Sequence, residues 1–86
     1  MDIYREFMKP GPKNQDLFKY VVPGIGKHEA EQCHKRHIKT VNELIAQFWI
    51  NDCNLEEFQI FLEVDIGINP KRAKECAQAM CIKFGF

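Results

Sequence analysis

The segment that most constrains this chain is 21–30, Val-Val-Pro-Gly-Ile-Gly-Lys-His-Glu-Ala. Two glycines one residue apart allow backbone conformations that are closed to other residues, and Ile25 between them can anchor the turn in a core. A helix is expected to follow from Lys27. Amides at a helix start point outward without intrahelical partners, at the positive end of the helix dipole. The segment therefore predicts a turn between two helices whose backbone can hold one phosphate group.

The same segment also allows a purely structural interpretation, in which Gly24 and Gly26 only form a tight connection between two core helices. A dinucleotide site is disfavoured, because the third glycine, a preceding strand and a βαβ context are all missing. The full pattern, an apolar pair, Pro-Gly-Ile-Gly and then Ala30, is more specific than a lone Gly-x-Gly. It resembles the helix-hairpin-helix motif of proteins that bind DNA without recognising its sequence.

A second helix start is predicted at Asn69-Pro70, with Asn69 as the N-cap and Pro70 as the first helical residue. Lys71, Arg72 and Lys74 follow in the first turns, where basic side chains oppose the helix dipole and lower stability slightly. A phosphate bound at this helix start would offset that loss. The alternative is a solvated helix face that tolerates the mismatch.

Other helix starts follow from their caps. Asp2 and Asp16 cap two short helices near the N-terminus, and Asn54 caps one in the second half of the chain. Thr40 and Glu43 form a capping box before the most apolar helix, which is expected at the centre of the core. The helix after the glycine turn is expected over 27–37, and the last helix is expected to end near residue 83.

Apolar residues at helical spacing define the expected core. They are Ala30 and Cys33; Val41, Leu44, Ile45, Phe48 and Trp49; Phe58, Phe61 and Leu62, with Ile60 and Val64 widening the stripe; and Ala73, Cys76, Ala77, Met80 and Cys81. No segment shows strand periodicity. The predicted fold is all-α, a compact bundle of five to six short helices that contains the helix-hairpin-helix motif, in a single domain spanning 1–86.

Apolar content exceeds what a small domain can bury. Of the 86 residues, 45% are hydrophobic and seven are phenylalanine, whereas a domain of this size buries only about 60–65% of its unfolded surface. A dimer would cover the excess. No run approaches the roughly 18 apolar residues of a membrane span, and charged residues interrupt the start, so neither membrane insertion nor a signal peptide is expected.

Charge is balanced overall but unevenly distributed. The net charge is zero, which argues against a strongly basic nucleic-acid-binding coat. Residues 1–42 carry eight bases and five acids, 43–65 carry six acids and no base, and 66–86 carry four bases and one acid. Only the two ends of the sequence are electrostatically suited to DNA.

A zinc site has to be considered, since the chain contains four cysteines and three histidines: Cys33, Cys53, Cys76, Cys81, His28, His34 and His37. Their spacing matches no familiar ligand pattern, and no Cys-x-x-Cys pair is present. Reduced, mostly buried thiols in an intracellular protein are the favoured interpretation, with no metal or other cofactor. The chain also has no serine and no paired carboxylates that suggest catalysis, so it is not expected to be an enzyme.

The order of these features resembles the barrier-to-autointegration factor family, small DNA-bridging proteins of the nuclear envelope. The resemblance covers nearly the whole chain. It rests on Arg5-Glu6-Phe7, Gly24-Ile25-Gly26, Gln47-Phe48 and Gly67-Ile68-Asn69-Pro70-Lys71, with Cys76 in the helix that follows. Ile3 stands where the family has a basic residue, and Ala46 and His37 stand where it has glycines. The chain is therefore identified as a divergent member.

The resemblance implies a homodimer that bridges two DNA duplexes in chromatin through backbone contacts, with a groove for LEM-domain membrane proteins at the dimer interface. It implies a nuclear location, with the cytoplasm as a second compartment. The DNA contacts carried over are Gly24, Ile25, Gly26, Lys27, His28, Asn69, Pro70 and Lys71. One alternative is a regulatory relative that forms a heterodimer with a DNA-binding member and modulates it, which the zero net charge and Ile3 support. An accessory domain of a repair enzyme is a third.

Overall fold

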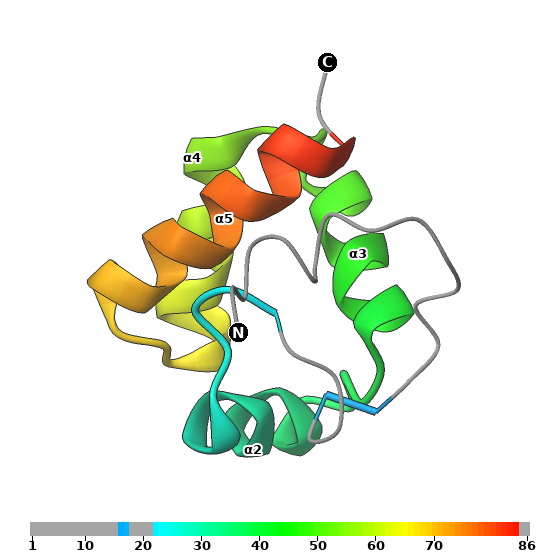
Figure 1. Ribbon diagram of the computed structural model, residues 1–86, viewed down its shortest axis with the longest axis vertical. Coiled ribbons are helices and arrows are strands. Elements are labelled where there is room, and N and C mark those ends of the chain that lie inside the picture. Colours follow the sequence, from blue (N-terminus) through cyan, green and yellow to red (C-terminus); the bar gives the residue numbers. More distant parts are fainter. Residues whose placement is uncertain (1–15, 18–21, 85–86) are drawn as a thin grey trace.

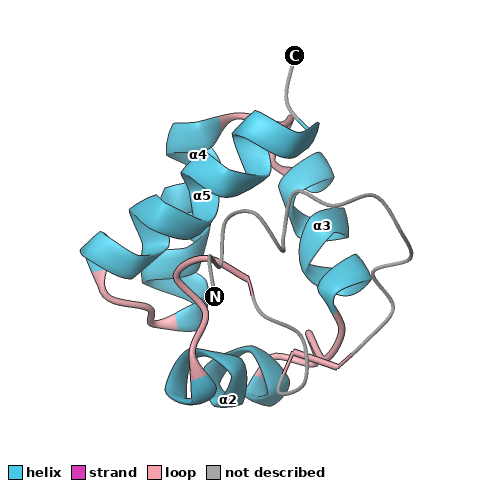
Figure 2. Cartoon of the chain, in the orientation of Figure 1, coloured by secondary structure: helices cyan, strands magenta, loops and turns pink. Residues whose placement is uncertain are grey.

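The structure, a computed structural model, describes residues 16–17 and 22–84, and the regular elements within these ranges are helices joined by loops and turns (Figures 1 and 2). Its helices are α2 Lys27–Lys35, α3 Val41–Ile50, α4 Leu55–Phe61, the π-helical turn η1 Leu62–Ile66, and α5 Pro70–Phe84. The only β-type pairings among the described residues are two isolated bridges. The all-α prediction is confirmed. The helix predicted at Asp2, and the residues after Leu17 in the helix predicted at Asp16, lie outside the described residues.

Helices α4 and α5 form the packed centre of the fold. The α4–η1 segment runs along α5, which returns in the opposite sense, while α3 flanks them and α2 lies across one end (Figure 1). Phe48 of α3 meets Phe58 of α4 edge to face, with ring centroids 5.3 Å apart. Both rings are fully buried, as are Ala73 and Met80 of α5. The core predicted for α3 and α5 is thus confirmed at these positions.

Side-chain caps set the starts of α3 and α4 as predicted. The Thr40 hydroxyl accepts the Glu43 amide hydrogen at 3.1 Å, and Glu43 Oε1 accepts the Thr40 amide hydrogen at 3.0 Å. Hydrogen bonds from the Lys39 amide, and then from the Thr40 amide, hold the pKa of the Glu43 carboxyl below its usual value. Asn54 Oδ1 accepts the Glu57 amide hydrogen at 3.0 Å.

Three residues expected in the core are instead exposed: Trp49 by 49%, Ile60 by 58% and Val64 by 72%. Ile60 lies two positions from both Phe58 and Leu62, about 200° around the helix from the buried stripe. Two further large apolar residues, Ile50 and Ile82, are also exposed. The helical stripes are therefore narrower than predicted, and the described part of the chain carries substantial apolar surface.

Helix α2 ends two residues earlier than predicted. It stops at Lys35, with Arg36 as its C-cap. His37 has a φ of 65°, in the left-handed region, and this conformation ends a helix. Histidine therefore occupies a position whose backbone conformation favours glycine.

Candidate nucleic-acid interface

The glycine turn is held by one backbone hydrogen bond and one buried side chain. The Ile25 amide donates to the Val22 carbonyl oxygen at 2.9 Å. Ile25 itself is 6% exposed and belongs to the core, as predicted. Its side chain is therefore committed to packing, and any contact between Ile25 and a ligand runs through its backbone.

Gly24 is required by the fold itself. Its φ is 82°, a conformation that L-residues rarely adopt. A Cβ at Gly24 would clash with the carbonyl oxygen of Arg72 and would lie 2.9 Å from the backbone nitrogen of Cys76. The turn thus packs backbone to backbone against α5. Close packing of two segments therefore excludes a side chain at Gly24, as the structural interpretation of the turn requires, and contact between Gly24 and a phosphate stays a prediction.

Gly26 differs from Gly24 in conformation and in surroundings. It is the N-cap of α2 with φ −94° and ψ −166°, which other residues adopt freely. Having no side chain, it cannot accept a hydrogen bond from the first-turn amides of α2, and these have no intrahelical partner. The Gly26 amide donates to Glu29 Oε1 at 2.9 Å. At the predicted socket, the first-turn amides of α2 therefore have no side-chain cap, while the Gly26 amide beside them is already hydrogen-bonded.

The start of α5 has the predicted cap. Asn69 Oδ1 accepts the Arg72 amide hydrogen at 3.0 Å, and Pro70 is the first helical residue. Lys71, Arg72 and Lys74 are exposed, and the first turn of α5 contains no acidic residue. This helix start presents positive charge to solvent without an internal counter-charge in the same turn.

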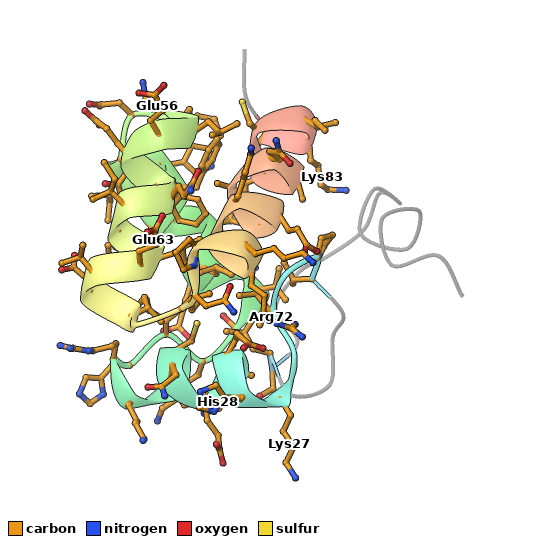
Figure 3. The ribbon with its side chains drawn as sticks, turned by 90° about the vertical axis from the view of Figure 1, so that its left-hand side faces the viewer. Lys27, His28, Glu56, Glu63, Arg72 and Lys83 are labelled. Carbon is orange, nitrogen blue, oxygen red and sulfur yellow. The ribbon has the colours of Figure 1, made fainter. Side chains whose placement is uncertain are left out.

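Packing of the turn on α5 brings the two predicted phosphate sites together. We call the surface formed by residues 24–28 and 69–72 the α2–α5 corner. Arg72 Nη1 lies 3.6 Å from Glu29 Oε1, so a side-chain contact also joins the two helices. Figure 3 shows Lys27 and His28 at one end of the molecule, Arg72 between that end and the middle, and Glu56 at the opposite end. The two helix starts therefore lie next to each other on one surface.

Both helix starts lie within a region that is similar to a known protein family. Residues 6–83 match the family model of barrier to autointegration factor. The chain belongs to this family. Members are small helical DNA-binding proteins that are associated with chromatin and are not enzymes. A comparison with curated proteins gave no match.

Within this barrier-to-autointegration factor domain, the carried-over DNA contacts fall in two sets. Lys27, His28, Asn69, Pro70 and Lys71 are exposed at the corner, whereas Gly24 and Gly26 are half-buried and Ile25 is buried. Sequence reasoning did not include Glu29 in the site. A signal was present, because a glutamate three residues after a helix N-cap is typical of a capping box.

The cysteines lie apart from the corner's exposed surface. Cys33 and Cys76 are fully buried, while Cys53 and Cys81 are half-buried, and all four are free thiols. Burial raises the pKa of the Cys33 thiol to about 12 and raises that of Cys76 further, so both remain protonated and unreactive. Among the described residues, no group of three His, Cys, Asp or Glu side chains is placed to hold a metal ion.

Membrane attachment through a spanning helix was not expected. None of the helices in the described ranges is both long enough and apolar enough to cross a bilayer.

Proposed function

We propose that this protein binds double-stranded DNA through the phosphate backbone at the α2–α5 corner, without sequence preference. The observation that carries the proposal is the packing of the Gly24 turn on α5, which sets the α2 amides and the basic first turn of α5 side by side. Backbone amides and lysines at this corner, Lys27 and Lys71, contact phosphates. Such contacts position a protein on DNA without reading bases.

Bridging requires two such corners in one particle, and we propose a homodimer as the source. Five large apolar side chains are exposed on the described helices: Trp49, Ile50, Ile60, Val64 and Ile82. An interface that covers several of them would remove apolar surface from water, and this burial would stabilise the dimer by about 25 cal/mol per Å² of buried surface. The proposal includes a role in chromatin at the nuclear envelope, and a LEM-domain partner at the dimer interface.

A regulatory role is the second candidate. In this role the chain forms a heterodimer with a DNA-binding family member and weakens its bridging. The observation in its favour is charge, because the net charge is zero and residues 43–65 contain six acids and no base. The two candidates differ in one measurable property, which is direct affinity for duplex DNA.

Light scattering coupled to size exclusion, with and without a short random-sequence duplex, separates the candidates. The protein alone is expected at about twice its chain mass of 10.1 kDa, and the complex is expected to contain one dimer and two duplexes. A monomer would contradict bridging, since one corner cannot hold two duplexes. A dimer that leaves the duplex unbound would favour the regulatory role. Gly26→Glu, which adds bulk and negative charge at the corner, serves as the variant that dimerises without binding.

A further inference from the structure

Glu29 has an unusual position for a charged residue in this protein. Among the described residues it is the one buried charged side chain, with 9% of its surface exposed. A single carboxylate oxygen, Oε1, accepts the Gly26 amide hydrogen at 2.9 Å and lies 3.6 Å from Arg72 Nη1. The carboxylate thus sits between the start of α2 and the first turn of α5.

Glu43, the equivalent residue of α3, shows what ordinary capping looks like. Its box is reciprocal, because the Thr40 hydroxyl accepts the Glu43 amide hydrogen while Glu43 Oε1 accepts the Thr40 amide hydrogen. Glu43 is exposed, and its hydrogen bonds within the described part of the chain are to Lys39 and Thr40, which are its neighbours in sequence. In α2 the box is one-sided, since Gly26 has no side chain, and the glutamate also reaches a cation on another helix.

The Glu29 carboxylate therefore contacts both parts of the α2–α5 corner, through the Gly26 amide on the α2 side and the Arg72 guanidinium on the α5 side. An incoming phosphate would compete for the Gly26 amide and for the Arg72 guanidinium. Arg72 is about half exposed, with a side-chain exposure of 49%, so solvent and a phosphate can reach it. While the pair is formed, a negative charge stands where a second anion would have to bind, and part of the positive charge of Arg72 is neutralised.

We propose that Glu29 is an internal competitor for DNA phosphate and thereby sets the DNA affinity of this protein. This inference rests on the proposed function. DNA binding displaces the carboxylate from the Gly26 amide and from Arg72, and a phosphate oxygen takes its place. The position of Glu29 then holds the affinity below the value that the basic residues of the corner alone would give.

Glu29→Gln tests the inference, because it removes the charge and keeps an oxygen that can accept the Gly26 amide hydrogen. Affinity for a labelled random-sequence duplex, measured by fluorescence anisotropy at fixed salt, is expected to rise about tenfold. Glu31→Gln is the matched control, since it makes the same change in net charge on an exposed residue of the same helix. Its expected gain is below about twofold.

The role of Arg72 is tested by repeating Glu29→Gln in an Arg72→Gln background. The gain is expected to shrink to about threefold, because only the repulsion of phosphate by the carboxylate is then relieved. Equal gains in DNA affinity in the wild-type and Arg72→Gln backgrounds would show that the release of Arg72 from Glu29 does not contribute to binding. The part of the inference that concerns Arg72 would then be overturned.

The outcomes separate this inference from the function on which it rests. A wild-type protein that binds, with Glu29→Gln no tighter than Glu31→Gln, overturns the inference and leaves the proposed function standing. Binding by neither wild type nor Glu29→Gln overturns both. Binding by Glu29→Gln alone supports the inference in its strongest form. Thermal unfolding of Glu29→Gln and of Glu29→Leu accompanies the series, and loss of the fold in both would show that Glu29 is a structural cap.

Discussion

Helices α4 and α5 begin with the same cap. Asn54 accepts the Glu57 amide hydrogen at 3.0 Å, and Asn69 accepts the Arg72 amide hydrogen at the same distance of 3.0 Å. The backbone capping chemistry of the two helix starts is therefore matched. The two helices also pack against each other in opposite directions, so their starts lie at opposite ends of the packed pair (Figure 1).

Charge is where the two starts differ. The first turn of α4 carries Glu56 and Glu57, whereas α5 begins with Lys71 and Arg72, has Lys74 in the next turn and has no acidic residue in its first turn. Acidic residues at a helix N-terminus stabilise it and basic ones destabilise it, each by about 0.3–1 kcal/mol. Helix α5 thus keeps a start that stability alone disfavours. The proposed binding of a DNA phosphate at the corner would offset this loss of stability.

The largest effect is expected when α5 is given the charge of α4. Lys71→Glu combined with Lys74→Glu should weaken binding to a random duplex about hundredfold, because two attractive contacts become repulsive. The midpoint of thermal unfolding should stay the same or rise, since the new charges suit the helix dipole. Anisotropy titration and thermal unfolding of the same samples check both parts.

A double variant that reverses the charge of the α4 start in the opposite sense controls for the effect of net charge on DNA affinity. Glu56→Lys combined with Glu57→Lys should lower stability and should raise DNA affinity by no more than about twofold. A gain comparable to the loss in the α5 variant would show that overall charge, and not the α2–α5 corner, determines binding.

An intermediate effect is expected when α2 receives the side-chain cap that α4 and α5 already have. Gly26→Ser supplies a hydroxyl that accepts a first-turn amide hydrogen, which should raise stability by a few tenths of a kcal/mol. The same hydroxyl occupies an amide that a phosphate would use, and we expect affinity to fall about tenfold. Thr40→Ser, which keeps an equivalent cap at α3, should change neither property. Unchanged DNA affinity in Gly26→Ser would exclude the α2 amides from the interface.

The smallest effect is expected from removing the two matched caps. Asn54→Ala and Asn69→Ala should each lower the free energy of unfolding by about 1 kcal/mol, equivalent to about 4–8 °C in a domain of this size. Only Asn69→Ala should also weaken DNA binding, by about threefold, because Asn69 lies at the corner. Equal DNA affinities of the two variants would show that Asn69 caps α5 without contributing to DNA binding.

Local chemistry explains what the sequence predicts well. The caps at Thr40, Asn54 and Asn69 depend on hydrogen bonds that span three residues, so the starts of α3, α4 and α5 follow from short patterns. Burial of Ile25 follows in the same way from an apolar residue between two glycines. The two phosphate sites were predicted from these helix starts, and the resemblance to the barrier-to-autointegration factor family then supplied the individual DNA contacts expected there.

Long-range contacts explain what the sequence does not predict. Nothing in the order of residues shows that Gly24 packs on the Arg72 and Cys76 backbone, or that Arg72 pairs with Glu29. Only the fold therefore shows which backbone atoms Gly24 packs against. It alone also shows that the Glu29 carboxylate lies against Arg72 at the α2–α5 corner. Exposure of Ile60 was missed for another reason. Its apolar side chain suits either a core or an interface, and only its position opposite the buried stripe of the helix excludes it from the core.

The salt dependence of duplex affinity tests the central claim most directly. If DNA phosphates are held at the α2–α5 corner, two to four contacts per site should give a slope of log K against log salt of about −2 to −4. Lys71→Glu should make this slope shallower by about one. A wild-type slope near zero, or an unchanged slope in a folded Lys71→Glu variant, would contradict phosphate binding at this corner.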